Sequence, residues 1–131
     1  MVRLYLHVTL IKFTSFQNSN LSAHLSFLAD NVYLDGFRIR NAKDIVVHVG
    51  RGLSNVKLID MIILGSTISP VSNPSNERGL IVVSRRSEVQ IISSKFHWNT
   101  ATVLYNDGIT TVHSTNMKNN RKRSNGSKVS L

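Results

Sequence analysis

The side chains best suited to chemistry in this sequence are an adjacent histidine and tryptophan, His97 and Trp98. An aromatic ring at the edge of a turn can stack on a sugar ring, and it can equally cover the end of a hydrophobic core. Trp98 stands where other repeats of the chain carry small or polar residues, namely Gln17, Asn41, Gly65 and Asn119. We therefore expect His97 and Trp98 to contribute to substrate binding.

Two further histidines and a pair of arginines are candidate binding residues. His24 and His48 lie 24 residues apart and are expected to project outward in one column, close enough to share a metal ion or a ligand carboxylate. No third ligand accompanies them, so no metal site is predicted. Arg85 and Arg86 could bind an anionic sugar, although they fall in an expected turn, where arginines commonly serve only as soluble surface.

The acidic residues of the first repeats do not form a catalytic pair. Hydrolysis of a glycosidic bond needs two carboxyl groups at a defined separation, whereas Asp30, Asp35, Asp44 and Asp60 fall in different columns. Asp35 and Asp44 fit turns better. A lyase would instead need a basic residue beside a uronate and a cation that neutralises the carboxylate. No catalytic residue and no cofactor is assigned, and a divalent cation would enter only with lyase chemistry.

These side chains are positioned by an internal repeat, which decides the fold. Residues 31–39 align without a gap with residues 55–63, at a shift of 24. Each repeat is measured from one reference residue, and these are Val8, Val32, Val56, Val89 and Thr110. Two positions after the reference, every repeat carries an aliphatic residue, and this column is predicted to be core: Leu10, Leu34, Leu58, Ile91 and Val112. Apolar residues follow an i, i+2 pattern and many are β-branched, so strands are favoured over helices.

A second strand precedes the reference in each repeat. Its predicted inward columns hold Leu25, Val49, Val82 and Val103, and Ala23, Val47, Leu80 and Ala101, while His24, His48, Ile81 and Thr102 between them are expected to point outward. Asparagine tolerates the left-handed conformation that tight turns use. A turn ladder is predicted from Asn18, Asn41, Asn99 and Asn120.

The repeat spacing predicts one insertion and a tail. The reference residues are separated by 24, 24, 33 and 21 residues, and the excess falls at 69–78, which holds both prolines. Five of the 16 basic residues lie beyond residue 117, in a segment rich in serine and asparagine. We therefore predict β-helix coils over residues 1–117, with the loop insertion at 69–78, and a disordered, basic, flexible tail over 118–131.

Composition excludes several classes of function. The sequence has no cysteine, which rules out disulfides, thiolate metal sites and cysteine nucleophiles. No run approaches the roughly 20 apolar residues of a membrane span, and no convincing signal peptide opens the chain. The net charge of +9 is concentrated in the tail, so nucleic acid is not the expected partner.

Units such as residues 31–41 and 87–92 resemble the structural repeat of the right-handed parallel β-helix, or pectin-lyase-like, superfamily. The resemblance implies an all-β, single-stranded parallel β-solenoid of about four to five coils, in a fragment or truncated member. It also implies polysaccharide binding, or descent from a polysaccharide lyase or glycoside hydrolase, at a cell, virion or extracellular surface. The alternatives are a non-catalytic solenoid of the adhesin or tailspike kind and, for the fold, an antiparallel sandwich. Open strand edges predict a homo-oligomer or flanking coils.

Overall fold

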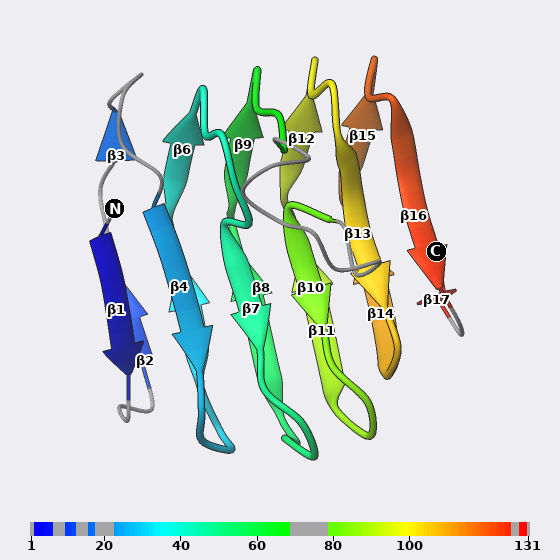
Figure 1. The fold of residues 1–131 in the computed structure, drawn as a ribbon. Coiled ribbons are helices and arrows are strands. Elements are labelled where there is room, and N and C mark those ends of the chain that lie inside the picture. Colours follow the sequence, from blue (N-terminus) through cyan, green and yellow to red (C-terminus); the bar gives the residue numbers. More distant parts are fainter. Residues whose placement is uncertain are drawn as a thin grey trace.

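The protein is described by a computed structural model of parallel strands wound into a β-helix of about four coils. The structure describes residues 2–6, 10–12, 16–17, 23–68, 79–126 and 129–130, and side chains over 25–68 and 79–121. No helix occurs in these segments. Each strand pairs with the strand three places further along the chain, as β1 does with β4. The coils follow one another from the blue to the red end of Figure 1. The predicted parallel β-solenoid is confirmed.

The strands form three sheets, which we call A, B and C. Sheet A contains β1 (Val2–Leu6), β4 (Ala23–Phe27), β7 (Val47–Val49), β10 (Ile81–Val83), β13 (Thr102–Asn106) and β16 (Lys122–Gly126). Sheet B contains β2 (Leu10–Lys12), β5 (Tyr33–Asp35), β8 (Val56–Ile59), β11 (Glu88–Ile92), β14 (Ile109–His113) and β17 (Val129–Ser130). Sheet C contains β3 (Phe16–Gln17), β6 (Arg38–Arg40), β9 (Ile62–Leu64), β12 (Lys95–His97) and β15 (Asn116–Lys118).

The core lies between the sheets and is built from columns of inward side chains, each column formed by equivalent residues of successive coils. In sheet B, Leu34, Leu58 and Ile91 pair in register and are fully buried, and Val112 continues the column. In sheet C the inward column is Ile39, Ile63, Phe96 and Met117. The described strands of sheets B and C from β5 onward bury alternate side chains because successive residues point to opposite faces, whereas β10 of sheet A buries all three of its residues. Stacking gives every coil the partner surface that it could not provide for itself.

A short turn of constant length joins sheet B to sheet C. Its first residue has a positive φ in all four coils: 78° at Gly36, 49° at Asp60, 51° at Ser93 and 47° at Ser114. A single left-handed residue redirects the chain while the backbone ladder continues, as in the bond from the Asp60 amide to the Ile92 carbonyl at 3.0 Å. Sheets B and C therefore keep one register relative to each other in these coils.

The register predicted for sheet A is wrong. Leu25 pairs with Val47 rather than Val49, and Val47 pairs with Ile81, which is buried and not outward. The cause is the turn that leads from sheet A to sheet B, which we call the A–B turn. Its length changes from coil to coil, so the residues of sheet A do not lie at a fixed number of positions before those of sheet B. Phe27 precedes Val32 by five residues, whereas the equivalent Val49 precedes Val56 by seven. The register predicted for the first coil of sheet B is also wrong by one residue, since Leu10 pairs with Tyr33 and not with Leu34.

The C-terminal segment differs from the predicted flexible tail. β15 extends to Lys118, β16 pairs with β13, and β17 pairs with β14. Strand pairing extends to the basic residues because backbone groups, not side chains, form the ladder, and the basic side chains of an edge strand can remain in solvent. The predicted loop insertion at 69–78 lies outside the described residues.

Candidate functional site

The outer face of sheet C carries the largest group of basic side chains that neighbouring strands bring together. By register, Arg38, Ile62, Lys95 and Asn116 form one outward column, and Arg40, Leu64, His97 and Lys118 form the next. The two arginines and two lysines are exposed, while the aliphatic and histidine side chains are half-buried. We call these eight positions, together with Trp98, the basic face. Strands about 4.8 Å apart place Arg40 and Lys118 roughly 14 Å from each other across three intervals.

Trp98 follows the end of β12 at the border of the basic face. It has φ 53°, and its equivalents in the neighbouring coils, Asn41, Gly65 and Asn119, have φ 55°, 58° and 55°. The ladder runs through this column, with the Trp98 amide donating to the Lys118 carbonyl at 3.2 Å. The predicted equivalence with Asn41, Gly65 and Asn119 is confirmed, whereas Gln17 pairs with Arg40. A bulky residue in the left-handed region is an outlier, which neighbouring coils avoid with asparagine or glycine.

The tryptophan ring projects into solvent rather than into the core. Its side chain is 60% exposed. The ring meets the His97 imidazole edge to face, with centroids 5.3 Å apart and planes at 87°. The Nε2 atom of His97 is buried and has no hydrogen-bond partner among the described residues. An unsatisfied buried polar atom and a bulky left-handed residue are each costly, and strained residues of this kind cluster at functional sites.

A buried polar ladder beneath Trp98 fixes the turn. Asn99 is 1% exposed; its Oδ1 accepts the Ser66 amide at 2.9 Å, and its Nδ2 donates to the Ile63 carbonyl and to Asn120 Oδ1 at 3.2 and 2.8 Å. The predicted pairing of Asn99 with Asn120 is therefore confirmed. Asn41 belongs to the same turn but lies one position earlier, where it aligns with Trp98 as predicted. Asn18 lies outside the described residues.

None of the four cations of the basic face forms an ion pair with an acidic side chain among residues 25–68 and 79–121, where the one ion pair is Arg85 with Asp107. The described outward strand positions of this face carry no aspartate or glutamate. Asp44 and Asp60 lie in the turns at its two borders, and Asp44 Oδ1 accepts the Ile45 amide at 2.7 Å. Asp30 likewise accepts the Ser54 amide at 2.8 Å. Asp44 and Asp30 thus bond backbone amides in turns, as expected for Asp44.

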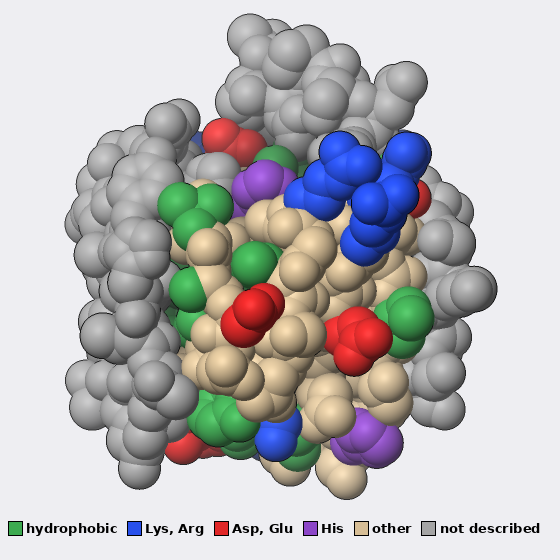
Figure 2. Space-filling model, turned by 90° about the horizontal axis from the view of Figure 1, so that it is seen from below, with side chains coloured by type: hydrophobic (Ala, Val, Ile, Leu, Met, Phe, Trp, Pro, Cys, Tyr) green, Lys and Arg blue, Asp and Glu red, His purple; other side chains and the backbone are tan. Residues whose placement is uncertain are grey.

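The remaining predicted site residues lie elsewhere. The predicted stack of His24 on His48 is wrong, since His24 pairs with Arg3, and His48 lies between Ser26 and Val82. The variable A–B turn is again the cause, and the side chain of His24 lies outside the described residues. Arg85 and Arg86 occupy an A–B turn, at the opposite end of sheet A from Trp98, and a compact basic patch is visible at that end (Figure 2).

Sequence reasoning missed the four cations of the basic face. Arg38, Arg40 and Lys95 were not singled out, and Lys118 was assigned to the tail. A usable signal exists in the strands themselves, where an apolar residue stands between two polar ones in Arg38-Ile39-Arg40, Lys95-Phe96-His97 and Asn116-Met117-Lys118. The alternation predicts that both flanking residues point outward together.

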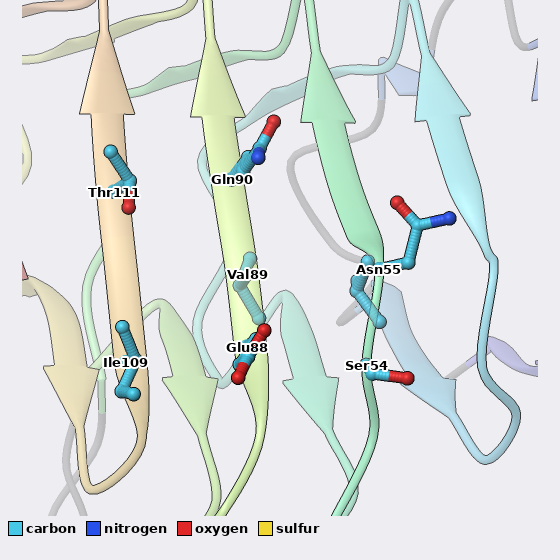
Figure 3. A pocket seen from close by; sticks show the side chains of 8 residues that line it. Ser54, Asn55, Glu88, Val89, Gln90, Ile109 and Thr111 are labelled. Carbon is cyan, nitrogen blue, oxygen red and sulfur yellow. The ribbon is translucent and has the colours of Figure 1, made fainter.

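A shallow hollow of about 270 Å³ marks the outer face of sheet B. Figure 3 shows Glu88 and Gln90 on β11 between Ile109 and Thr111 on β14 and Ser54 and Asn55 before β8. Glu88 contributes the single carboxyl group of this lining. Two carboxyl groups are needed for ordinary glycoside hydrolysis, so the hollow lacks that arrangement.

Neither metal binding nor membrane insertion finds support in the described side chains and segments. Over these residues, no three histidine, aspartate or glutamate side chains gather as a metal site. The described segments also contain no helix with the length and apolarity to cross a bilayer. The basic face with Trp98 is thus the candidate site with the most functional groups.

Comparison with protein-family models, curated proteins and solved structures finds no match for this chain. The architecture of parallel strands in three sheets is a β-solenoid, and the functional argument therefore depends on the side chains of this chain.

Proposed function

We propose that the protein is a polysaccharide-binding β-helix that holds an acidic glycan along the basic face. The observation that carries the proposal is the exposed Trp98 ring, held in a left-handed conformation beside four cations that pair with no acidic side chain of the described residues. Carboxylate or sulfate groups of the glycan would pair with Arg40, Lys95 and Lys118. The indole ring would stack on one sugar ring. The resemblance to pectin-lyase-like proteins agrees with this class of ligand.

The aliphatic outward residues of β9, within the basic face, favour a glycan over a nucleic acid as the ligand. Ile62 and Leu64 separate the arginines of β6 from the cations of β12 and β15. Sugar rings present apolar C–H surfaces that pack on such residues, whereas single-stranded nucleic acids are typically bound by several aromatic platforms. Trp98 is the single aromatic side chain among the described positions of this face.

Reversing one charge tests this proposal. Lys95→Glu is expected to weaken binding of polygalacturonate about tenfold in isothermal titration calorimetry at low salt, because it removes a cation and adds a repulsive anion. Raising the ionic strength should weaken wild-type binding as well. The matched control is Lys57→Glu, the same charge change on sheet B, where Lys57 lies over the Tyr33 ring at 5.0 Å. Equal affinity losses in both variants would contradict a binding site on sheet C.

A second candidate function, a structural solenoid that associates end to end, is supported by the strand edges. In the described structure β15, β16 and β17 are each the last strand of a sheet and pair on one side alone. Unpaired parallel edges invite addition of another chain. We expect the sedimentation coefficient to increase with protein concentration in analytical ultracentrifugation. A constant monomer value across a hundredfold concentration range would contradict this expectation.

A further inference from the structure

A serine and a histidine lie in hydrogen-bond contact at the end of the molecule opposite Trp98. His48 Nε2 is 3.1 Å from Ser84 Oγ, and the contact is partly buried. His48 lies in an outward position of β7, and Ser84 follows β10, with its amide donating to the Val49 carbonyl at 3.1 Å. The backbone ladder thus holds both residues on neighbouring strands. Contact between a hydroxyl and a basic imidazole nitrogen is the geometry that activates a serine nucleophile.

The serine opens into a cationic pocket. A hollow of about 270 Å³ is lined by Arg51, Ser84, Arg85 and Asp107, from three successive A–B turns. Viewed from this end of the molecule, basic side chains cluster on one side of the surface (Figure 2). A substrate in solvent can therefore reach the Ser84 hydroxyl through a pocket that carries two arginines and one aspartate.

One of the two arginines has its charge compensated and the other does not. Arg85 Nε lies 3.4 Å from Asp107 Oδ2, with side chains 68% and 34% exposed. Between residues 25–68 and 79–121 this is the one ion pair, so Arg51 faces the pocket without a carboxylate partner. A guanidinium in this position favours a substrate that carries a carboxylate of its own.

We propose that Ser84 and His48 form a nucleophile–base pair that hydrolyses carboxylic esters with an anionic acyl group, an activity beyond the proposed glycan binding. With its proton on Nδ1, His48 accepts the hydroxyl proton at Nε2 while Ser84 Oγ forms a bond to the ester carbonyl carbon. Guanidinium donors of Arg85 not used by Asp107 stabilise the resulting oxyanion. Arg51 binds the acyl carboxylate.

Collapse of the tetrahedral intermediate breaks the bond to the leaving alcohol, which takes its proton from His48 and departs. The acyl group remains on Ser84 Oγ. Water then attacks the acyl carbon while His48 accepts its proton, and the second collapse returns that proton to Ser84 Oγ and releases the acid. No oxidant, reductant or metal is consumed, and the products are one alcohol and one carboxylate.

The test compares two chromogenic esters, mono-p-nitrophenyl succinate and p-nitrophenyl acetate, on the full chain. We expect a burst of p-nitrophenol and a succinyl group on Ser84 by peptide mass spectrometry. Ser84→Ala and His48→Gln should lower the succinate rate by about 10²–10⁴-fold. Arg51→Gln should lower the ratio of the succinate rate to the acetate rate about tenfold. Ser54→Ala, an exposed serine in the adjacent turn, is the control and should retain the wild-type rate.

Three outcomes would overturn the proposal. One is a Ser84→Ala variant with the wild-type rate, and another is acylation at a residue other than Ser84. The third is the absence of any hydrolysis above the buffer rate in the folded wild-type chain. If Ser84→Ala does not fold by circular dichroism, labelling of the wild-type chain with phenylmethanesulfonyl fluoride decides the question, since the sulfonyl group must then be found on Ser84.

Discussion

Asn99→Ala is expected to lower the free energy of unfolding by about 3 kcal/mol. The amide of Asn99 bonds the Ser66 amide, the Ile63 carbonyl and Asn120 Oδ1 in the interior. Alanine removes the side-chain partner of the buried Ser66 amide and of the Ile63 carbonyl, whereas Asn120 Oδ1 still accepts the backbone amide of residue 99 at 3.2 Å. An unpaired buried polar group costs about 1–3 kcal/mol. Denaturation by urea, followed by circular dichroism, measures the difference.

The matched control for Asn99 is Asn116→Ala. Asn116 lies on an outward position of β15 and is half-buried, so its loss should change stability by less than about 0.5 kcal/mol. Similar stabilities for the two variants would contradict the role of the buried ladder in fixing the turn before sheet A.

Trp98→Asn is expected to weaken binding of an acidic glycan at least about tenfold while changing the free energy of unfolding by less than about 1 kcal/mol. The substitution introduces the residue that neighbouring coils use at this left-handed position, Asn41 and Asn119. It relieves backbone strain and opens His97 Nε2 to solvent, which offsets the loss of the edge-to-face contact with His97.

This prediction separates the two interpretations of the tryptophan. A Trp98 that covers the core would cost about 3–5 kcal/mol on removal, as large buried aromatics do. Urea denaturation of the variant gives the stability, and calorimetry with polygalacturonate gives the affinity. A large loss of stability with unchanged affinity would assign Trp98 to the core and contradict its role as a sugar platform.

Much of the fold could be predicted from the sequence because one turn has constant length. The B–C turn always spans the same number of residues, so the columns through Leu34 and Ile39 follow directly from the repeat. The A–B turn varies, and a repeat that is measured from sheet B cannot reveal the register of sheet A. For this reason Ile81 was expected outside and His48 was expected beside His24.

The candidate site was predictable only in part. Trp98 stood out because its column is otherwise small or polar, and the structure gives the physical reason, since the described residues Asn41, Gly65, Trp98 and Asn119 of that column have a positive φ. The contact between His48 and Ser84 was not predictable, because it depends on a pairing across 36 residues that includes the insertion. The cations of the basic face follow from strand alternation once the strands of sheet C are known.

The most direct test of glycan binding uses the fluorescence of Trp98, which is the one tryptophan in the sequence. Its exposed ring reports contact with a ligand without any label. Titration with polygalacturonate at low salt should change the emission intensity and shift the maximum to shorter wavelength with saturation, while neutral dextran should leave the spectrum unchanged. An unchanged spectrum with polygalacturonate, or an equal response to double-stranded DNA, would contradict acidic-glycan recognition by the basic face.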